Sequence, residues 1–266
     1  MSAYCFISDY LQFDIFFIPL HLKKKNNKSM ISKNQQKLIR SLSLKKNRER
    51  ERLFVAEGPK VVADLQHAGF VAEQLYAIPD VSEEEMQRVS FLQHPQGVIA
   101  LFRLPDQPPL DSIPFSDLTL MLDGIQDPGN LGTIIRIADW FGIEHIICSL
   151  DTADCWAPKV VQASMGSIAR VHIYYTDLLP LLDQAVRSNI PVYGTLLDGE
   201  NIYQHELTDH GIIVMGNEGK GISEPVRQRV THRLLIPNFH AGPSADSLNV
   251  AIATAITCSE FRRRTK

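Results

Sequence analysis

The chain has 266 residues, of which 44% are hydrophobic and 21% are charged. This is the balance of a globular protein with room for one or two cores, and it excludes a disordered or low-complexity chain. The four cysteines, Cys5, Cys148, Cys155 and Cys258, form no Cys-X-X-Cys pair and lack metal-ligand spacing. We therefore expect no metal site and the reduced thiols of a cytoplasmic protein.

The net charge of −3 hides a strongly basic segment. Residues 23–52 hold twelve Lys or Arg and two Glu, a local charge of +10, so the remainder carries −13. This asymmetry predicts a basic arm that binds RNA. The alternative is a solvated helical face, since the alternating Arg and Glu of residues 48–52 can pair along a helix. The residues expected to contact RNA are Lys37, Arg40, Lys45, Lys46 and Arg48.

Residues 1–29 are rich in Phe, Ile, Leu and Tyr and contain a basic run after the apolar stretch. A signal peptide has its positive charge before the apolar stretch. Asp9 and Asp14 also interrupt the stretch, which leaves nothing near the ~20 residues of a membrane span. We expect no membrane segment and interpret residues 1–29 as an extension upstream of the natural start. The alternative is a genuine peripheral segment or short anchor.

Residues 30–103 have the pattern of a small α/β domain. A recurrence of Leu and Ile among basic residues predicts helix over residues 32–53. The further expected elements are strands at 53–57, 71–78 and 98–102 and helices at 60–67 and 83–89. Residues 104–115 contain four prolines and few residues able to pack, so we expect an interdomain linker there.

Residues 116–266 alternate between the two kinds of element. Strands are expected at 118–122, 145–149, 171–175, 192–197, 212–215 and 233–236, and helices at 131–141, 157–165, 177–188, 223–230 and 247–262. This alternation predicts an α/β fold with a mostly parallel sheet covered by helices on both faces.

Three polar or Gly-rich segments lie where predicted strands give way to predicted helices: residues 123–136, 216–223 and 247–250. Ligands of open α/β folds bind beyond the carboxyl ends of the strands, so the segments predict one composite site. Glycine spacing in the second segment matches neither a Walker A loop nor the dinucleotide fingerprint.

Individual residues in these segments each have a structural alternative. Arg136 on an apolar helix needs an anion or carboxylate partner, but it could equally be a surface Arg on a helix capped by Asn130. Glu218 could accept a hydrogen bond from a ribose hydroxyl or hold a neighbouring Arg. A capping role at the start of the last helix is enough to explain the presence of Ser247. It does not explain the presence of Asn249, which is a poor helix former at the same end of the helix.

Taken together, the three segments resemble the signature motifs of the SpoU/TrmH family, RNA ribose 2'-O-methyltransferases of the SPOUT superfamily. The resemblance covers residues 33–264. It implies that residues 116–266 form a deep trefoil knot, a rare exception to un-knotted chains, and bind S-adenosylmethionine. Residues 30–103, with Glu57–Pro59 and His94–Val98, look like the family's RNA substrate-binding domain, which is similar to ribosomal protein L30e.

The resemblance also implies roles for single residues. Catalytic roles fall on Asn130, Arg136, Glu218, Ser247 and Asn249, and cofactor binding falls on Gly216, Asn217, Gly219, Ile236, Leu248 and Asn249. Arg136 would clamp the RNA phosphate and the developing alkoxide, or act as the base, with Glu218 fixing it in place. Asn130 and Asn249 would orient the ribose. A sulfonium is already a strong electrophile, so the reaction needs no metal.

The implied reaction is methylation of a ribose 2'-hydroxyl in structured RNA, with rRNA favoured over tRNA. The implied assembly is a homodimer formed through the C-terminal domain. Two alternatives remain open from the sequence: a non-catalytic RNA-binding protein on a knotted scaffold, and a base-methylating enzyme of the same superfamily.

Overall fold

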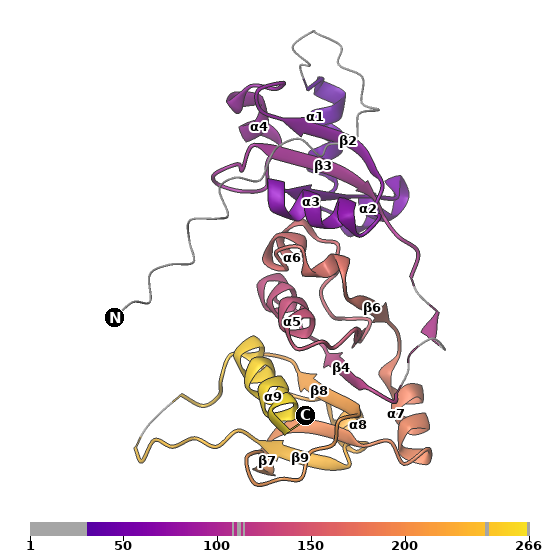
Figure 1. The fold of residues 1–266 in the computed structure, drawn as a ribbon, viewed down its shortest axis with the longest axis vertical. Helices are drawn as coiled ribbons and strands as arrows, with labels where there is room; N and C mark the ends of the chain where they lie inside the picture. The colour runs from indigo at the N-terminus through magenta and orange to yellow at the C-terminus, as the bar shows by residue number, and fades with distance from the viewer. Residues whose placement is uncertain (1–30, 108, 111–112, 114, 243–244, 265–266) are drawn as a thin grey trace.

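The computed structural model describes residues 31–107, 109–110, 113, 115–242 and 245–264, so our interpretation of residues 1–29 lies outside the described residues. The described chain forms two stacked parts (Figure 1). We call residues 31–103 the N-terminal part and residues 115–264 the C-terminal part. Each part has its own β-sheet, and the described residues of the connection, 104–107, 109–110 and 113, lie along one side.

The N-terminal part is built on a three-stranded antiparallel sheet of order β1-β3-β2. Its side chains alternate between the two faces. Ile99 and Leu101 of β3 join the core beneath α1 and α4, whereas Ala100 and Phe102 face the other way. The elements are α1 (Lys33–Ser41), α2 (Lys45–Glu51), β1 (Leu53–Glu57), α3 (Pro59–His67), β2 (Ala72–Ala77), α4 (Glu83–Val89) and β3 (Val98–Arg103).

The C-terminal part is built on a six-stranded sheet of order β6-β5-β4-β8-β7-β9, in which every neighbouring pair is parallel. Its strands are β4 (Leu118–Asp123), β5 (His145–Cys148), β6 (His172–Tyr175), β7 (Val192–Asn201), β8 (Gly211–Gly216) and β9 (His232–Leu235). Its helices are α5 (Pro128–Trp140), α6 (Pro158–Ala163), α7 (Leu178–Arg187), α8 (Glu224–Arg227) and α9 (Val250–Arg264), with a 3-10 turn, η2 (Ser167–Ala169).

Helices cover both faces of this sheet. Leu120 and Leu122 of β4 pack in the cluster that includes α5 and α9, whereas Met121 packs in the cluster that includes α7 and α8. The predicted α/β fold with a mostly parallel, two-sided sheet is therefore confirmed. The trefoil knot within it stays a prediction.

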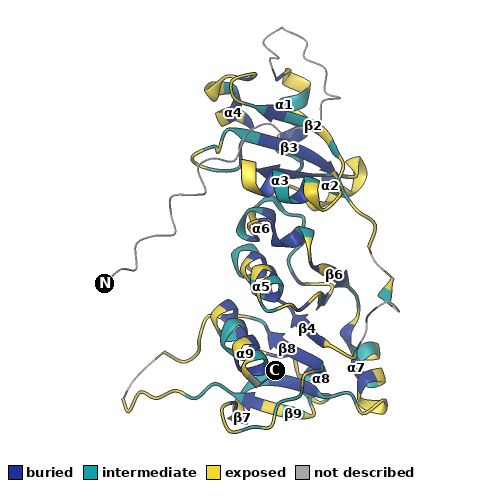
Figure 2. Ribbon diagram, viewed as in Figure 1, coloured by how far each residue is buried: buried dark blue, intermediate teal, exposed yellow. Residues whose placement is uncertain are grey.

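The two parts share one hydrophobic core. The central strands β3, β4 and β8 are largely buried, whereas the edge strands β2 and β9 are mostly half-buried (Figure 2). The largest cluster runs without a break from Phe54 of β1 to Leu120 of β4 and Phe261 of α9. Trp156, in the loop before α6, lies at the junction with its ring centroid 4.5 Å from that of Phe54 and 5.9 Å from that of Phe70. The N-terminal part is thus packed against the C-terminal part by apolar contact.

Two expectations from the sequence require correction. Residues 32–53 form two helices rather than one continuous pattern, because the hydroxyls of Ser41 and Ser43 donate to the carbonyls of Leu38 and Arg40 and compete with the helical ladder. The expected linker also packs: Ile113 is buried against the α7 side of the sheet. None of the helices in the described ranges has the length and hydropathy of a membrane span.

Candidate active site

The three predicted segments meet at the carboxyl edge of the parallel sheet. The first follows β4 and leads into α5, the second follows β8, and the third precedes α9. Since β4 and β8 are neighbours in the sheet, the turns that follow them lie side by side. Asp123, at the end of β4, accepts a hydrogen bond from the backbone N–H of Ser223 at 2.7 Å and ties the first two segments together.

Glu218 fixes the shape of the turn before α5. Its carboxylate accepts hydrogen bonds from the backbone N–H groups of Gln126 at 3.3 Å and Asp127 at 3.1 Å, and from the side-chain amide of Asn130 at 3.1 Å. Burial raises the pKa of Glu218, but these hydrogen bonds favour the carboxylate more strongly, so the net effect lowers the pKa below its usual value. Glu218 is therefore an ionised anchor for the turn.

Asn249 joins the third segment to the first. Its side-chain amide donates to Oδ1 of Asn130 at 2.9 Å, while its own Oδ1 accepts from the backbone N–H groups of Ala251 and Ile252. Asn249 thus caps α9, which begins at Val250. The expectation that Ser247 caps this helix is wrong, because the helix starts three residues later.

Asn130 is held on both sides of its amide, since Nδ2 donates to Glu218 and Oδ1 accepts from Asn249. An amide has two N–H donors and two lone pairs. One of each remains available to a ligand. Asn130 is not the cap of α5: Asp127 is, and it accepts from the backbone N–H of Asn130 at 2.9 Å.

Arg136 lies on the exposed face of α5. Gly129, Thr133 and Trp140 share this face by helical spacing. Both oxygens of Glu218 are engaged by the turn before α5, so the expectation that Glu218 fixes Arg136 is wrong. Within the described residues no hydrogen bond or ion pair engages the Arg136 side chain, which leaves its guanidinium able to meet an anion.

The second segment forms a tight turn. Asn217 and Gly221 exchange two backbone hydrogen bonds, and Oδ1 of Asn217 accepts from the backbone N–H groups of Gly219 and Lys220 at 3.0 Å each. The side-chain amide of Asn217 also donates to the carbonyl of Gly124 at 2.6 Å. A Cβ at Gly216 would lie 2.2 Å from the backbone nitrogen of Ile222, so only glycine fits there.

The surroundings of Gly216 suit S-adenosylmethionine. β7 pairs with β8 as far as Gly194 and Val214 and with β9 at Thr195 and Leu234, so Gly216 and Ile236, each two residues further along the chain, continue toward the same edge. Leu197 and Leu248 are 76% and 49% exposed, although both are large apolar side chains. An apolar edge beside the backbone polar groups of a glycine turn is what a purine and its ribose require. These residues therefore fit the cofactor.

Two residues near the site were missed from the sequence. Asp127 caps α5, and the side chain of Lys159 on α6 reaches within 3.5 Å of its Oδ2. The hydrogen bond from the backbone N–H of Asn130, with Lys159 nearby, lowers the pKa of Asp127. Pro128 in the first turn was an available signal for a cap at 127. No local signal points to Lys159, which is 32 positions away.

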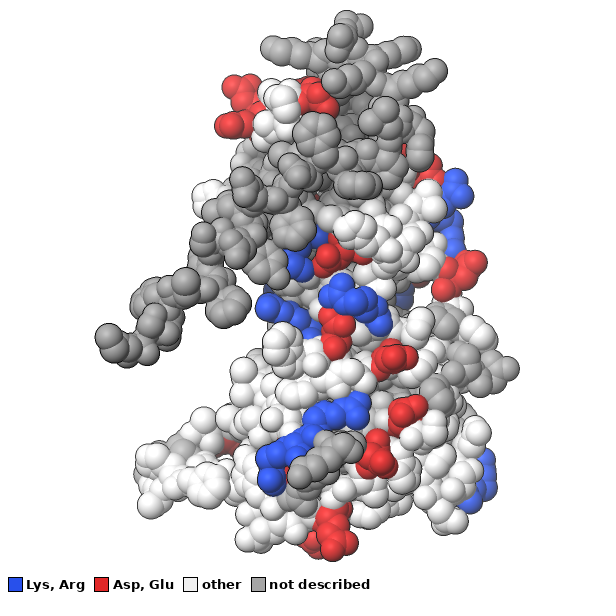
Figure 3. All heavy atoms as spheres, in the orientation of Figure 1, with Lys and Arg blue, Asp and Glu red and all other residues white. Residues whose placement is uncertain are grey.

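The predicted RNA contacts divide into two groups. Lys37, Arg40, Lys45 and Lys46 are exposed on the N-terminal part. Arg48 is 2% exposed, and its guanidinium pairs with Asp154, so the expectation that Arg48 contacts RNA is wrong. On the face drawn in Figure 3, Lys and Arg are interspersed with Asp and Glu rather than forming a continuous basic patch.

Comparison with known proteins agrees with this geometry. The family model for the SpoU rRNA Methylase family matches residues 117–259, and that for the MRM3-like substrate binding domain matches residues 33–87. The chain belongs to the SpoU rRNA methylase family. A curated relative from Bacillus subtilis, 23S rRNA (guanosine(2553)-2'-O)-methyltransferase RlmP, is 29% identical over 248 residues, covering 87% of this chain and 97% of its own.

Solved structures of this family share the whole architecture. A TrmH-family protein from Porphyromonas gingivalis is 42% identical with a TM-score of 0.79, covering 89% of this chain and 100% of its own. An AdoMet-bound rRNA methyltransferase from Sinorhizobium meliloti is 30% identical with a TM-score of 0.75, covering 87% and 95%. The predictions of a SpoU-family RNA 2'-O-methyltransferase, acting on rRNA with S-adenosylmethionine as cofactor, are confirmed.

Proposed function

We propose that this enzyme methylates the ribose 2'-hydroxyl of a guanosine in 23S rRNA. The observation that carries the proposal is the Asn130 amide, fixed between Glu218 and Asn249 at the carboxyl edge of the sheet. The guanosine target is supported by the name of the Bacillus subtilis relative, which is similar over most of both chains. A reaction on rRNA would take place in the cytoplasm.

The bound cofactor would supply an electrophilic methyl group on a sulfonium. Gly216, Asn217, Gly219, Ile236, Leu248 and Asn249 would hold it against the edge of β8 and β9. Asn130 would use its remaining N–H and lone pair to orient the ribose. Because Glu218 and Asn249 fix that amide before RNA binds, the orientation costs little conformational entropy at the moment of reaction.

Arg136 would bind the RNA phosphate next to the target ribose and stabilise the oxyanion that forms as the 2'-hydroxyl loses its proton. Its exposure and the absence of a competing carboxylate among the described residues support this role. A guanidinium does not readily give up its own proton in a protein, so a clamp is favoured over a base. Ser247, exposed beside Leu248, would face the same ribose.

The predicted RNA substrate-binding domain, residues 30–103, would bind the RNA, with Lys37, Arg40, Lys45 and Lys46 as phosphate contacts. We also propose that the protein forms a homodimer through residues 116–266. The chain of these residues would form the predicted trefoil knot. Trp140 on α5 is 84% exposed and Ile252 on α9 is 53% exposed, and these two helices pack together. Asn130 lies beside Asn249 and Phe141 lies beside Arg262, so Ile252 is near one end of this helix pair and Trp140 is near the other. An interface that runs along both helices would cover both exposed apolar side chains.

The test combines titration calorimetry with S-adenosylmethionine and methylation of a 23S rRNA transcript, followed by nucleoside analysis for 2'-O-methylguanosine. Arg136→Ala should keep the cofactor affinity and lose methylation by about a hundredfold or more. Arg187→Ala, an exposed Arg at the end of α7, is the matched control and should be unaffected. Near-normal turnover in Arg136→Ala would overturn its role, and absent cofactor binding by the wild type would favour a non-catalytic scaffold.

A further inference from the structure

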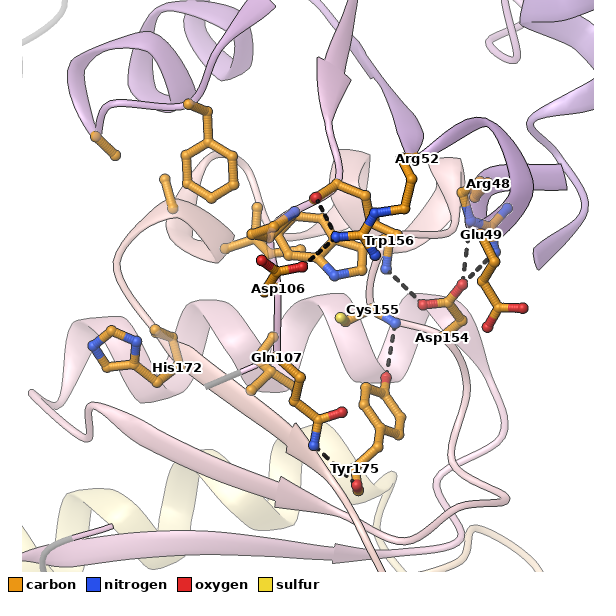
Figure 4. A pocket seen from close by; sticks show the side chains of 18 of the residues that line it. Arg48, Glu49, Arg52, Asp106, Gln107, Asp154, Cys155, Trp156, His172 and Tyr175 are labelled. Carbon is orange, nitrogen blue, oxygen red and sulfur yellow. Dashed lines mark hydrogen bonds and ion pairs between the residues drawn. The ribbon is translucent and has the colours of Figure 1, made fainter. Parts of the chain in front are cut away.

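The loop between β5 and α6 touches both parts of the molecule. We call residues 149–157 the joint. Figure 4 shows its Asp154, Cys155 and Trp156 between Arg48 of α2 and Tyr175 of β6. A cavity of about 590 Å³ opens beside these residues and separates the N-terminal part from β6 at this edge.

On the side of the N-terminal part, the joint is held by a buried charge pair. Nε and Nη2 of Arg48 both donate to Oδ2 of Asp154, and Nη1 of Arg48 donates to the carbonyls of Leu42 and Ser43. The side chains of Arg48 and Asp154 are only 3% and 16% exposed. Because the donors of a guanidinium lie in a rigid plane, this pair fixes the orientation of Asp154 relative to Arg48 as well as the distance between them.

On the side of the active site, the joint is bonded to the turn that follows β4. The backbone N–H of Gly124 donates to Oγ of Ser149 at 2.8 Å, and the N–H of Ala153 donates to the carbonyl of Ile125 at 2.8 Å. The carbonyl of Gly124 in turn accepts from Asn217 of the second segment. The joint therefore reaches the turn that Glu218 shapes through two direct hydrogen bonds.

Tyr175 of β6 forms hydrogen bonds with the backbone of the joint. Its hydroxyl donates to the carbonyl of Ala153 and accepts from the N–H of Cys155 at 2.8 Å. Gln107, from the connection between the two parts, donates to the carbonyl of Tyr175 at 3.0 Å (Figure 4). Through these bonds the joint is tied to the active-site turn, to β6 and to the N-terminal part.

We propose that the joint sets the position of the RNA-binding part relative to the methyl-transfer site, with Arg48 and Asp154 as positioning residues that do not touch RNA or cofactor. This rests on the proposed function. RNA held by the N-terminal part reaches the site correctly only while the Arg48–Asp154 pair fixes the joint. A misplacement of about 1 Å lowers the rate of an oriented reaction by up to about a hundredfold.

The test must separate positioning from folding stability. Arg48→Met/Asp154→Leu removes both buried charges together, so neither charge is left unpaired. The remaining cost is the loss of the hydrogen bonds to the carbonyls of Leu42 and Ser43 and from the backbone N–H of Trp156. We would measure thermal unfolding, cofactor Kd by calorimetry, RNA Kd by filter binding, and kcat with saturating RNA. The control is Arg229→Met, which breaks the ion pair between Asp183 of α7 and Arg229 in the turn after α8, remote from the joint.

The double variant should remain folded at the assay temperature with a somewhat lower melting temperature, keep both binding constants within about twofold and lose kcat by about ten- to a hundredfold. Wild-type kcat in the stable double variant would overturn the proposal. If the double variant does not fold, Arg48→Lys replaces it, because this substitution keeps the charge but loses the forked contact with Asp154. The same loss of kcat with unchanged RNA affinity is expected for Arg48→Lys. An unchanged kcat in Arg48→Lys would equally refute the positioning role of Arg48. Inactive wild-type protein would instead overturn the proposed function.

Discussion

The side chain of Asn249 caps α9 and binds Asn130, and substitutions can separate these two roles. Its Oδ1 caps α9 through the N–H groups of Ala251 and Ile252, and its Nδ2 donates to Asn130. Asn249→Ala removes both. Asn249→Ser keeps a capping oxygen, since Ser and Asn are comparable caps, but loses the reach to Asn130. The two variants should therefore share a loss of activity and differ in stability.

The expected magnitudes follow from these bonds. Losing the cap costs about 1 kcal/mol, which for a chain of this size lowers the melting temperature by roughly 2–4 °C in Asn249→Ala only. Losing one hydrogen bond on Asn130 is worth about 0.5–1.5 kcal/mol, so kcat/KM should fall about twofold to tenfold in both variants. Differential scanning calorimetry and RNA methylation rates measure the two effects. Equal melting temperatures for the two variants would refute the cap, and wild-type rates in both would refute the contact with Asn130.

Three further outcomes are expected. Gly216→Ala should lower the melting temperature and abolish cofactor binding, because its Cβ would lie 2.2 Å from the backbone nitrogen of Ile222. In the control Gly219→Ala the nearest atom to the new Cβ is Oδ1 of Asn217 at 3.7 Å, so this variant should have the melting temperature of the wild type. Carboxyl NMR should give Glu218 a pKa below 4.5. The contribution of the Glu218 carboxylate to folding stability is then present above pH 4.5 and is lost as the pH falls through the lowered pKa. A measured pKa at or above 4.5 would contradict this. Trp140→Ser should shift a dimer toward monomer in analytical ultracentrifugation, and an unchanged sedimentation profile would remove α5 from the interface.

Much of the C-terminal fold could be predicted because parallel strands buried on both faces appear as continuous apolar runs. Residues 211–215 are such a run, residues 118–122 are interrupted only by Thr119, and both segments lie in the centre of the sheet. The convergence of the three segments followed from the same rule about strand ends. What failed was local: Asp127 and Asn130 are both good caps, and the pattern alone did not select between them.

Side-chain partners that are distant in sequence could not be predicted. Arg48 belongs to a basic run and has the composition of an RNA contact, yet its partner Asp154 lies 106 positions away. Glu218 was assigned to Arg136 because a carboxylate and a guanidinium attract. The backbone N–H groups of the turn before α5 satisfy that carboxylate instead, a geometry that no residue pattern reports.

The long sequence separation between Asn130 and its two side-chain partners has a consequence for biosynthesis. Glu218 lies 88 positions after Asn130, and Asn249 lies 119 positions after it. Pairings of such long separation form slowly, since the intervening chain must first be closed into a loop. On the ribosome the N-terminal part can collapse early, but Asn130 gains its last partner only after nearly the whole chain has emerged. A prematurely terminated nascent chain would therefore carry the N-terminal part without a completed active site.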